Sequence, residues 1–281
     1  KNKKNMLSKS VTSSEIASVI SKTTGIPLER MLESEKDKLL GMNLELKKMV
    51  IGQNDAIEKI SAAVLRSRAG IQNPNRPIGI FLFLGPTGVG KTELCKALSK
   101  FLFNEEKSLY RLDMSEYMEK HSVSKLIGSP PGYVGYESGG QLTESIRRKP
   151  YQVILLDEIE KAHSDIYNVL LQVFDDGRLT DSHGRVVNFR NTIIIMTSNI
   201  GAEHISFSEG QQSKIEVFTK EKVFEEIKVN FKPEFINRID EIILFNRLTK
   251  NEMKEILKIQ VQDLSRLLKD KKIIINIDKN A

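Results

Sequence analysis

The 281-residue sequence predicts an α/β fold, with a parallel central sheet and helices on both of its faces. Continuous apolar runs indicate strands that are buried on both sides, which is typical of covered parallel sheets. Four such runs span residues 80–84, 153–156, 193–196 and 242–245. Helical patterns lie between them, around residues 91–103, 164–174 and 219–229. This alternation predicts right-handed crossovers between parallel strands.

The residues before the first strand predict helices. One helix is expected from Thr12, which can form a capping box with Glu15. A second is expected over residues 28–48, and a third from about Asn54, a residue type that suits the N-cap position. We therefore expect an N-terminal helical extension or linker over residues 1–48.

The C-terminal part of the sequence predicts a loop, a long helix and one more strand. Residues 201–218 are polar and show no periodicity, so we expect a mobile loop there. A helical pattern follows from Thr249 to Leu268, and residues 273–277 look like a further strand. We expect a large domain over residues 49–247 and the start of a small, truncated C-terminal domain over residues 248–281.

Composition excludes several classes of function. The net charge is +6, but the lysines are interleaved with glutamates, as on solvated helix faces, so we expect no nucleic-acid partner. No apolar stretch reaches the roughly 20 residues that a membrane span needs, so we expect no membrane insertion. The single cysteine, Cys95, rules out an internal disulfide and is expected to pack inside a helix. The four histidines lack metal-ligand spacing, so we expect no zinc.

A phosphate-binding loop follows the first apolar run. The sequence G-x-x-x-x-G-K-T is matched in full between a predicted strand and a predicted helix. Its residues are Gly85, Pro86, Thr87, Gly88, Val89, Gly90, Lys91 and Thr92. Glycines let backbone N–H groups turn toward a phosphate, and the helix N-terminus adds a favourable dipole. We expect Lys91 to neutralise the β- and γ-phosphates of ATP, and the Thr92 hydroxyl to ligate Mg²⁺.

Polar residues at the carboxyl ends of two further strands complete the predicted site. Asp157 and Glu158 follow the run 153–156, at the edge of the sheet where ligands bind in open α/β folds. We expect Asp157 to hold Mg²⁺, directly or through water, and Glu158 to polarise the attacking water. Asn199 follows the run 193–196 and is the candidate contact to the γ-phosphate or the water.

Longer stretches of the sequence resemble a known family. The order of the motifs resembles that of an AAA+ ATPase: a phosphate loop, then a strand that ends in Asp-Glu, then a strand that ends in Asn. The detailed sequence resembles the second ATPase domain of Clp-family unfoldases, and the ClpB disaggregases most closely. The resemblance covers residues 12–248. The stretches that carry it are Asn75–Gly79, Gly85–Lys96, Asp113–Ser124, Pro130–Tyr136, Asp157–His163, Asp176–Asp181 and Phe231–Asp240.

The resemblance implies roles that the pattern alone does not give. Tyr133, within the stretch Gly132, Tyr133, Val134 and Gly135, matches the pore-loop aromatic that grips substrate. Arg238 matches the arginine finger that reaches the ATP of a neighbouring subunit. From the residues alone, Tyr133 reads as an ordinary loop tyrosine, and Arg238 as a partner for Asp240 or Glu241. Val50 and Ile51 match the segment that packs on adenine, and residues 177–184 resemble a second pore loop.

Two family features are missing from this sequence. The small C-terminal domain of the family carries a Gly-Ala-Arg motif whose arginine contacts nucleotide, and the sequence ends before it. The resemblance therefore implies weakened nucleotide affinity and assembly for this stretch alone. Protease-coupled Clp unfoldases carry an Ile/Leu-Gly-Phe/Leu tripeptide, which residues 200–230 lack. We therefore expect no ClpP-type protease docking.

The resemblance implies ATP-driven protein unfolding and disaggregation, in which a ring threads polypeptide through its pore. The expected cofactors are ATP or ADP and Mg²⁺. The expected partners are further copies of the chain, in a ring expected to be a hexamer, and unfolded or aggregated polypeptide, with co-chaperones as candidates. The sequence leaves the compartment open: the cytoplasm is the default, and an organelle or a secretory or vacuolar compartment is the alternative.

Three alternatives share the predicted ATP site. A nucleic-acid motor or clamp-loader-type AAA+ ATPase has only the basic charge in its favour. An adaptor that binds ATP as a structural ligand would be expected to lack Glu158 or Arg238, and both are present. The same motor residues could also serve protein translocation across a membrane.

Overall fold

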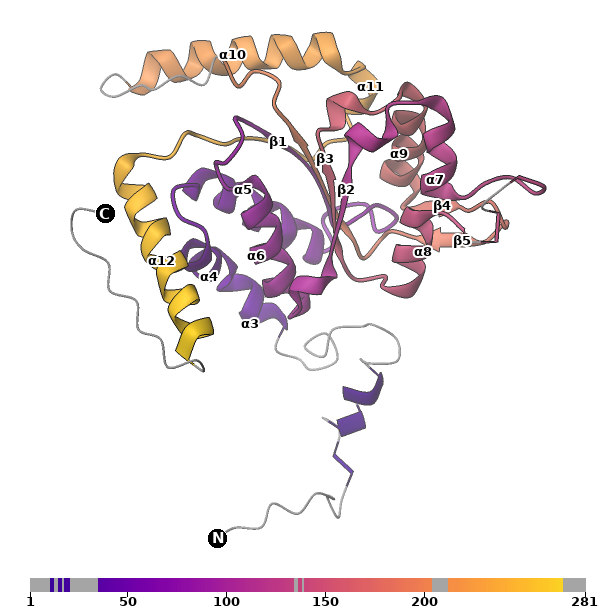
Figure 1. Cartoon of the computed structure of the whole chain (residues 1–281), viewed down its shortest axis with the longest axis horizontal. Coiled ribbons are helices and arrows are strands. Elements are labelled where there is room, and N and C mark those ends of the chain that lie inside the picture. Colours follow the sequence, from indigo (N-terminus) through magenta and orange to yellow (C-terminus); the bar gives the residue numbers. More distant parts are fainter. Residues whose placement is uncertain are drawn as a thin grey trace.

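The computed structural model describes residues 11–12, 15–16, 18–20, 35–133, 136–137, 139–203 and 212–269. Five parallel strands form the central sheet, in the order β2-β3-β6-β1-β7 (Figure 1). They are β1 (Gly79–Leu84), β2 (Leu109–Asp113), β3 (Val153–Asp157), β6 (Ile193–Ser198) and β7 (Glu241–Leu244). The inner strands β1, β3 and β6 are buried almost throughout, as their continuous apolar sequences predict.

Ten helices are labelled among the described residues. They are α3 (Glu35–Leu40), α4 (Met42–Met49), α5 (Asn54–Arg68), α6 (Lys91–Phe103), α7 (Val123–Ile127), α8 (Gln141–Arg148), α9 (Ser164–Asp176), α10 (Gln212–Asn230), α11 (Pro233–Ile236) and α12 (Lys250–Lys269). None of them is long and apolar enough to span a bilayer. An antiparallel hairpin of β4 (Arg178–Thr180) and β5 (Val186–Asn188) stands apart from the central sheet.

Two hydrophobic cores lie on opposite faces of the sheet. Because side chains alternate along a strand, Phe81 and Phe83 of β1 join one core, and Ile80 and Leu82 join the other. Helices α4, α5 and α6 supply the first core, whereas α8, α9, α10 and α11 supply the second. Helices therefore cover both faces, and the predicted fold class is confirmed.

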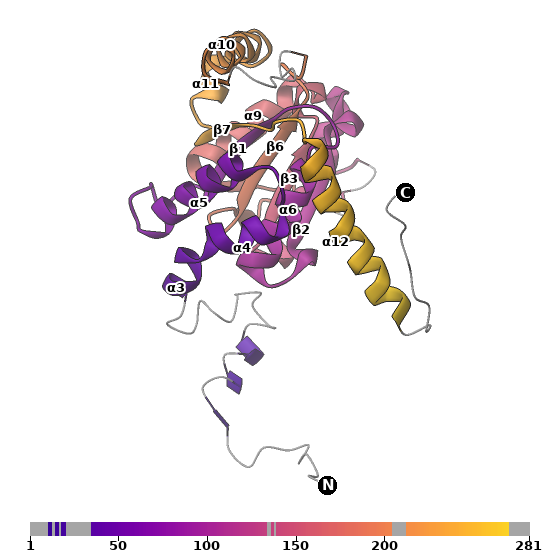
Figure 2. The ribbon, with the colours of Figure 1, turned by 90° about the vertical axis from the view of Figure 1, so that its left-hand side faces the viewer.

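Helix α12 lies at the periphery. In both views it is outside α4 and α6, on the face of the sheet that these helices cover (Figures 1 and 2). Its first turn approaches the segment after α4: a Cβ on Gly52 would lie 2.8 Å from Leu248 and 2.9 Å from Glu252. Hairpin β4–β5, α7 and α8 gather at the opposite end of the molecule (Figure 1).

Several predicted elements differ in detail from the structure. Thr12 and Glu15 do form the capping box, with the Glu15 N–H 3.3 Å from Thr12 Oγ1 and the Thr12 N–H 2.8 Å from Glu15 Oε2. Asn54, however, is the first helical residue of α5, and Gln53 occupies the N-cap. The predicted loop 201–218 is wrong in its second half, because α10 begins at Gln212.

Other predictions were incomplete. Strand β2, hairpin β4–β5 and helices α7 and α8 were not predicted at all. The helix expected over residues 28–48 is described from Glu35 and is interrupted at Gly41, between α3 and α4. The strand expected over 273–277 lies outside the described residues. The division at residues 48 and 247 stays a prediction.

Candidate functional site

The phosphate loop connects β1 to α6 at the carboxyl edge of the sheet. Gly85, Gly88 and Gly90 all have positive φ (144°, 80° and 102°), a backbone conformation that favours glycine. A Cβ on Gly85 would also lie 2.7 Å from the carbonyl oxygen of Phe245, whereas nothing lies within 4 Å of a Cβ on Gly88. The loop ends in the first turn of α6, where Lys91 is the first helical residue. Its N–H groups and the helix dipole favour a bound phosphate.

Lys91 joins the phosphate loop to the end of β6. Its Nζ donates to the carbonyl oxygens of Gly85 (2.7 Å) and Ser198 (3.2 Å) and to Asn199 Oδ1 (3.0 Å). The structure thus brings together Lys91 and Asn199, which the sequence placed in one site from separate motifs. Burial lowers the pKa of Lys91, although nearby carboxylates, Asp157 first among them, oppose this shift.

Asp157 lies at the carboxyl end of β3, between β6 and β2. Thr197 of β6 donates its hydroxyl to Asp157 Oδ1. On the other side, Arg111 of β2 lies 2.6 Å from Asp157 Oδ2. The sequence did not single out Arg111, because β2 was not predicted. Its place two residues before the stretch Asp113–Ser124, which resembles the family, was the available signal.

Glu158 follows Asp157 in a left-handed conformation, with φ of 55°. Its N–H donates to Thr197 Oγ1 at 3.2 Å, so the same threonine contacts both acids. Its carboxylate lies 2.5 Å from Lys161 Nζ, and the hydrogen bond to Glu158 raises the pKa of Lys161. Glu160 Oε1 accepts the N–H of Asn199 at 3.1 Å. Glu158, the predicted general base, is therefore positioned by Thr197 and Lys161, which the sequence did not single out.

The segment expected to pack on adenine lies beside the phosphate loop. Val50 is buried in the core, whereas Ile51 is partly exposed. Gln53 links this segment to the loop: its side-chain amide donates to the carbonyls of Val89 (3.1 Å) and Asn246 (2.9 Å). Gln53 was missed by the sequence analysis, in which a lone glutamine before a helix carried no signal.

Thr92, the predicted hydroxyl ligand, is the second residue of α6 and is partly exposed. A threonine hydroxyl and the Asp157 carboxylate are hard oxygen donors, the type that Mg²⁺ prefers. The donor set at this edge therefore fits a nucleotide with a hard divalent cation. Among the described residues, no cluster of three or more His, Cys, Asp or Glu side chains could hold a metal by itself.

Arg238 follows α11 and contacts a different part of the molecule. Its Nε donates to Asp175 Oδ1 of α9 at 3.1 Å, and its Nη1 donates to the carbonyl of Glu234 at 3.2 Å. The alternative partners expected from the sequence, Asp240 and Glu241, are therefore wrong. These contacts leave the side chain partly exposed. Arg238 precedes the amino end of β7, whereas Lys91 follows the carboxyl end of the neighbouring parallel strand β1.

Arg76 holds the segment that carries Arg238. Its Nη2 donates to the carbonyl of Arg238 at 2.6 Å, and its Nε donates to the carbonyl of Phe174 at 2.9 Å. Asp240 lies 3.5 Å from the same guanidinium and accepts the N–H of Ile80 at 2.8 Å. Burial raises the pKa of Asp240, and the N–H of Ile80 and the charge of Arg76 offset only part of this shift.

The predicted substrate loop is exposed at its tip. The side chain of Tyr133 is 70% exposed, and Gly132 before it has φ of 86°. The Tyr133 N–H donates to the carbonyl of Pro130 at 3.2 Å. Val134 and Gly135 lie outside the described residues. Exposure of a large aromatic side chain is compatible with a contact to another molecule.

Comparisons with known proteins show the family to which this chain is similar. Residues 76–242 match the family described as AAA domain (Cdc48 subfamily). The chain is 60% identical over 277 residues to chaperone protein ClpB of Rhizobium meliloti (strain 1021), and 59% identical over 280 residues to that of Brucella suis biovar 1 (strain 1330). These alignments cover 98% and 100% of the chain but 32% of each relative.

A solved structure is also similar. It is a closed-state cryo-EM reconstruction of Hsp104 with ATPγS and FITC casein, with a TM-score of 0.79 and 45% sequence identity. The likeness covers 91% of this chain and 44% of the Hsp104 chain. The chain therefore spans about a third of the ClpB relatives and under half of Hsp104, and the expected resemblance to ClpB-type proteins is confirmed.

Proposed function

This chain belongs to the AAA domain family (Cdc48 subfamily), and we propose that it is an ATP-hydrolysing motor domain that unfolds and disaggregates proteins. The observation that carries the proposal is the convergence of Lys91, Asn199, Asp157 and Glu158 beside a phosphate loop at one edge of the sheet. The relatives support the substrate class, since the ClpB proteins are chaperones and the similar Hsp104 structure was determined with casein.

In the proposed site, each residue acts on the nucleotide through its ordinary chemistry. Lys91 exchanges its present backbone acceptors for phosphate oxygens, and Asn199 orients the γ-phosphate or the attacking water. Thr92 and Asp157 would hold Mg²⁺, which supplies charge neutralisation at the phosphates. Glu158 accepts a proton from the attacking water, after its carboxylate leaves Lys161. Ile51 and Val50 bound the space for the adenine.

Assembly into a ring follows from two features in this proposal. Arg238 contacts Asp175 and precedes the amino end of β7, whereas Lys91 follows the carboxyl end of the parallel strand β1, which favours a role for Arg238 at the ATP of a neighbouring copy. Such a finger can contribute about 10³–10⁵ in rate, so hydrolysis would depend on assembly. Burial of one aromatic side chain contributes about 1.5–3 kcal/mol. The free energy of unfolding of a folded domain is about 5–15 kcal/mol, so one Tyr133 contact is insufficient and contacts from several copies are needed.

The test is ATP hydrolysis by the full-length protein that carries this chain. Hydrolysis is measured alone, with casein, and with single-stranded DNA. We expect casein to stimulate hydrolysis and DNA to have no effect. Stimulation by DNA alone would make the protein a nucleic-acid motor and overturn the proposed substrate, while leaving the ATP site in place.

Tyr133→Ala separates gripping from hydrolysis. Because Tyr133 is exposed and lies between α7 and α8 rather than in the phosphate loop, we expect basal hydrolysis within about twofold of the parent. We expect casein unfolding to be lost, because the substitution removes the apolar contact. Ile71→Ala, a similarly exposed apolar side chain between α5 and β1, is the control. Casein unfolding at the parental rate by Tyr133→Ala would remove Tyr133 from the substrate site.

A further inference from the structure

The loop that carries Tyr133, residues 128–140, is contacted near both of its ends by the turn between β4 and β5, residues 181–185. At its start, the N–H of Ser182 donates to the carbonyl of Ile127 at 3.1 Å. A Cβ on Gly128 would collide with the Ser182 hydroxyl, so the two backbones lie in close contact. Further along the loop, the Tyr136 ring lies 4.4 Å from the His183 ring. The hairpin turn therefore contacts the loop at its start and again at Tyr136.

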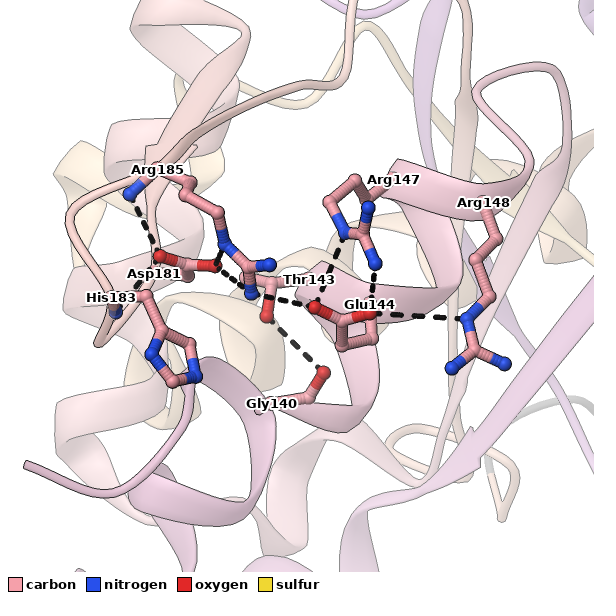
Figure 3. Close-up of polar contacts among 8 residues, drawn as sticks. All are labelled: Gly140, Thr143, Glu144, Arg147, Arg148, Asp181, His183 and Arg185. Atoms are coloured by element: carbon pink, nitrogen blue, oxygen red, sulfur yellow. Dashed lines mark hydrogen bonds and ion pairs between the residues drawn. The ribbon is translucent and has the colours of Figure 1, made fainter. Parts of the chain in front are cut away.

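At the far end of this loop, one arginine bridges two carboxylates. Arg185 of the hairpin donates from Nη2 to Glu144 Oε1 of α8 at 2.6 Å. Its guanidinium also contacts Asp181 Oδ2 at 2.7 Å. Figure 3 shows Arg185 between Asp181 and Glu144, whereas Arg147 and Arg148 approach Glu144 from the other side. Because α8 directly follows the substrate loop, the bridge fixes the point where that loop ends.

Both carboxylates of the bridge are largely withdrawn from water. The Asp181 side chain is 1% exposed, and it also accepts the N–H groups of His183 (2.9 Å) and Arg185 (2.8 Å). The Glu144 side chain is 16% exposed. Hydrogen bonds from Arg147 first, and then Arg185, hold the pKa of Glu144 below its ordinary value. Burial opposes ionisation of Asp181, but the N–H and guanidinium of Arg185 outweigh it and lower the pKa.

Of the arginines that pair with Glu144 in the described part of the chain, Arg185 is the one that comes from another element. Arg147 and Arg148 lie three and four residues further along α8, and their pairs with Glu144 are local to that helix. In the described part of the chain, Arg185 supplies the ion pair between α8 and the hairpin, and the two elements also share the core that contains Leu142 and Val187. Strand β4 of the hairpin directly follows α9, and α9 begins six residues after Glu158. The bridge therefore joins the substrate loop to the helix that leads away from the nucleotide site.

We propose that Arg185 is a positioning residue that couples the substrate loop 128–140 to hairpin β4–β5, so that the two move as one unit with α9. This inference rests on the proposed threading function for its consequence, though not for the coupling itself. The tip of the loop, at Tyr133, stays free to contact polypeptide. Loss of the bridge leaves the nucleotide site complete but lets the loop yield under load, so more ATP is consumed for each protein unfolded.

The coupling is tested by amide hydrogen exchange in the full-length protein. Arg185→Ala is compared with Arg147→Ala, which removes a guanidinium from the same carboxylate without cutting the bridge. We expect Arg185→Ala to speed exchange in residues 128–140 about tenfold, since loss of a hydrogen bond to a charged group shifts a local opening equilibrium by at least that factor. Arg147→Ala should leave that exchange within about twofold of the parent, because its bond is internal to α8.

A second route cuts the bridge from its other end. Glu144→Ala leaves Arg185 paired with Asp181 and should speed exchange in the same loop. If both residues act through one bridge, the double variant should exchange no faster than Arg185→Ala. Unchanged exchange in residues 128–140 in both single variants, or equal acceleration by Arg147→Ala, would overturn the coupling. If Arg185→Ala does not fold, Glu144→Ala alone decides between these outcomes.

The functional consequence has a separate readout. In the casein assay, Arg185→Ala should keep basal ATP hydrolysis and raise the ATP consumed per casein unfolded. Arg185→Lys keeps the charge but cannot contact both carboxylates as the guanidinium does, so its ATP consumption per casein should lie between that of the parent and that of Arg185→Ala. If Arg185→Ala speeds amide exchange but leaves the ATP consumed per casein unchanged, the role of Arg185 in threading is overturned and its coupling of the loop to the hairpin is retained. If the parent itself does not unfold casein, the proposed function fails, and the exchange result still decides the coupling.

Discussion

At the residue scale, the site is a set of side chains that satisfy one another. The Lys91 ammonium is bonded to two carbonyls and to Asn199, and Glu158 is paired with Lys161. A half-buried cation is costly unless acceptors surround it, which accounts for both its lowered pKa and its short contacts. A polyphosphate supplies stronger acceptors than these carbonyls. Binding would therefore redirect Lys91 rather than order a mobile side chain.

Lys91→Ala tests this residue directly. We expect the affinity for ADP and ATP to fall by at least about tenfold, because a charge-assisted contact to phosphate contributes roughly 1.5–3 kcal/mol. The measurement is a titration with a fluorescent nucleotide. Lys96→Ala is the matched control, since Lys96 lies on the exposed side of the same helix and pairs with Glu93. Equal affinity of the Lys91 variant and the control would remove Lys91 from the site.

Glu158→Gln separates binding from chemistry. The amide keeps the shape of the side chain but cannot accept a proton from water, and general-base catalysis typically contributes 10²–10⁴ in rate, so we expect hydrolysis to fall by about a hundredfold or more. Nucleotide affinity should stay at the parental value. Single-turnover hydrolysis of bound ATP is the measurement, with Glu93→Gln of α6 as the control. Normal turnover would assign the base to another group.

At the element scale, the sequence predicted the strands best where both faces of a strand are buried, because such strands are continuously apolar. Strands β1, β3 and β6 are central and were predicted within two residues at each end. Strand β2 was missed because it is an edge strand with mixed polarity, and its arginine was then missed as well. Hairpin β4–β5 has three-residue strands, which are too short to show a period. The contacts that position Asp157 and Glu158 form between neighbouring strands, and the local sequence pattern does not predict which residues meet there.

Two glycines of the phosphate loop should differ sharply on substitution. Gly85→Ala places a Cβ 2.7 Å from the Phe245 carbonyl at φ of 144°, whereas a Cβ on Gly88 meets no atom within 4 Å. We expect Gly88→Ala to cost about 1 kcal/mol from backbone strain alone, and Gly85→Ala about 3 kcal/mol because the contact adds to the strain. The urea midpoint of each variant gives the comparison. Equal midpoints would mean that the β7 segment moves aside easily.

At the scale of the whole molecule, the two parts of the proposed catalytic apparatus are attached to opposite ends of the neighbouring parallel strands β1 and β7. Lys91, Asp157 and Glu158 gather at the carboxyl edge of the sheet, and Arg238 is engaged with Asp175 on α9. A head-to-tail ring can bring the Arg238 face of one copy to the carboxyl edge of the next. The Arg76 contact to the Arg238 carbonyl keeps that face fixed to the body of the domain. Catalysis then becomes a property of an interface.

Mixing two inactive variants tests whether the site is shared between copies. Lys91→Ala lacks the phosphate contact but keeps Arg238, and Arg238→Ala lacks the finger but keeps Lys91, so neither full-length variant should hydrolyse ATP appreciably by itself. In random mixed rings about a quarter of the interfaces combine an intact phosphate loop with an intact arginine, because each interface is head-to-tail. We therefore expect hydrolysis to return on mixing, at up to about that fraction of the parental rate. Arg247→Ala, on the segment between β7 and α12, is the control that should stay active alone. Mixed rings as inactive as the separate variants would place Arg238 in the site of its own chain or outside catalysis, and the contact with Asp175 would then be a structural ion pair.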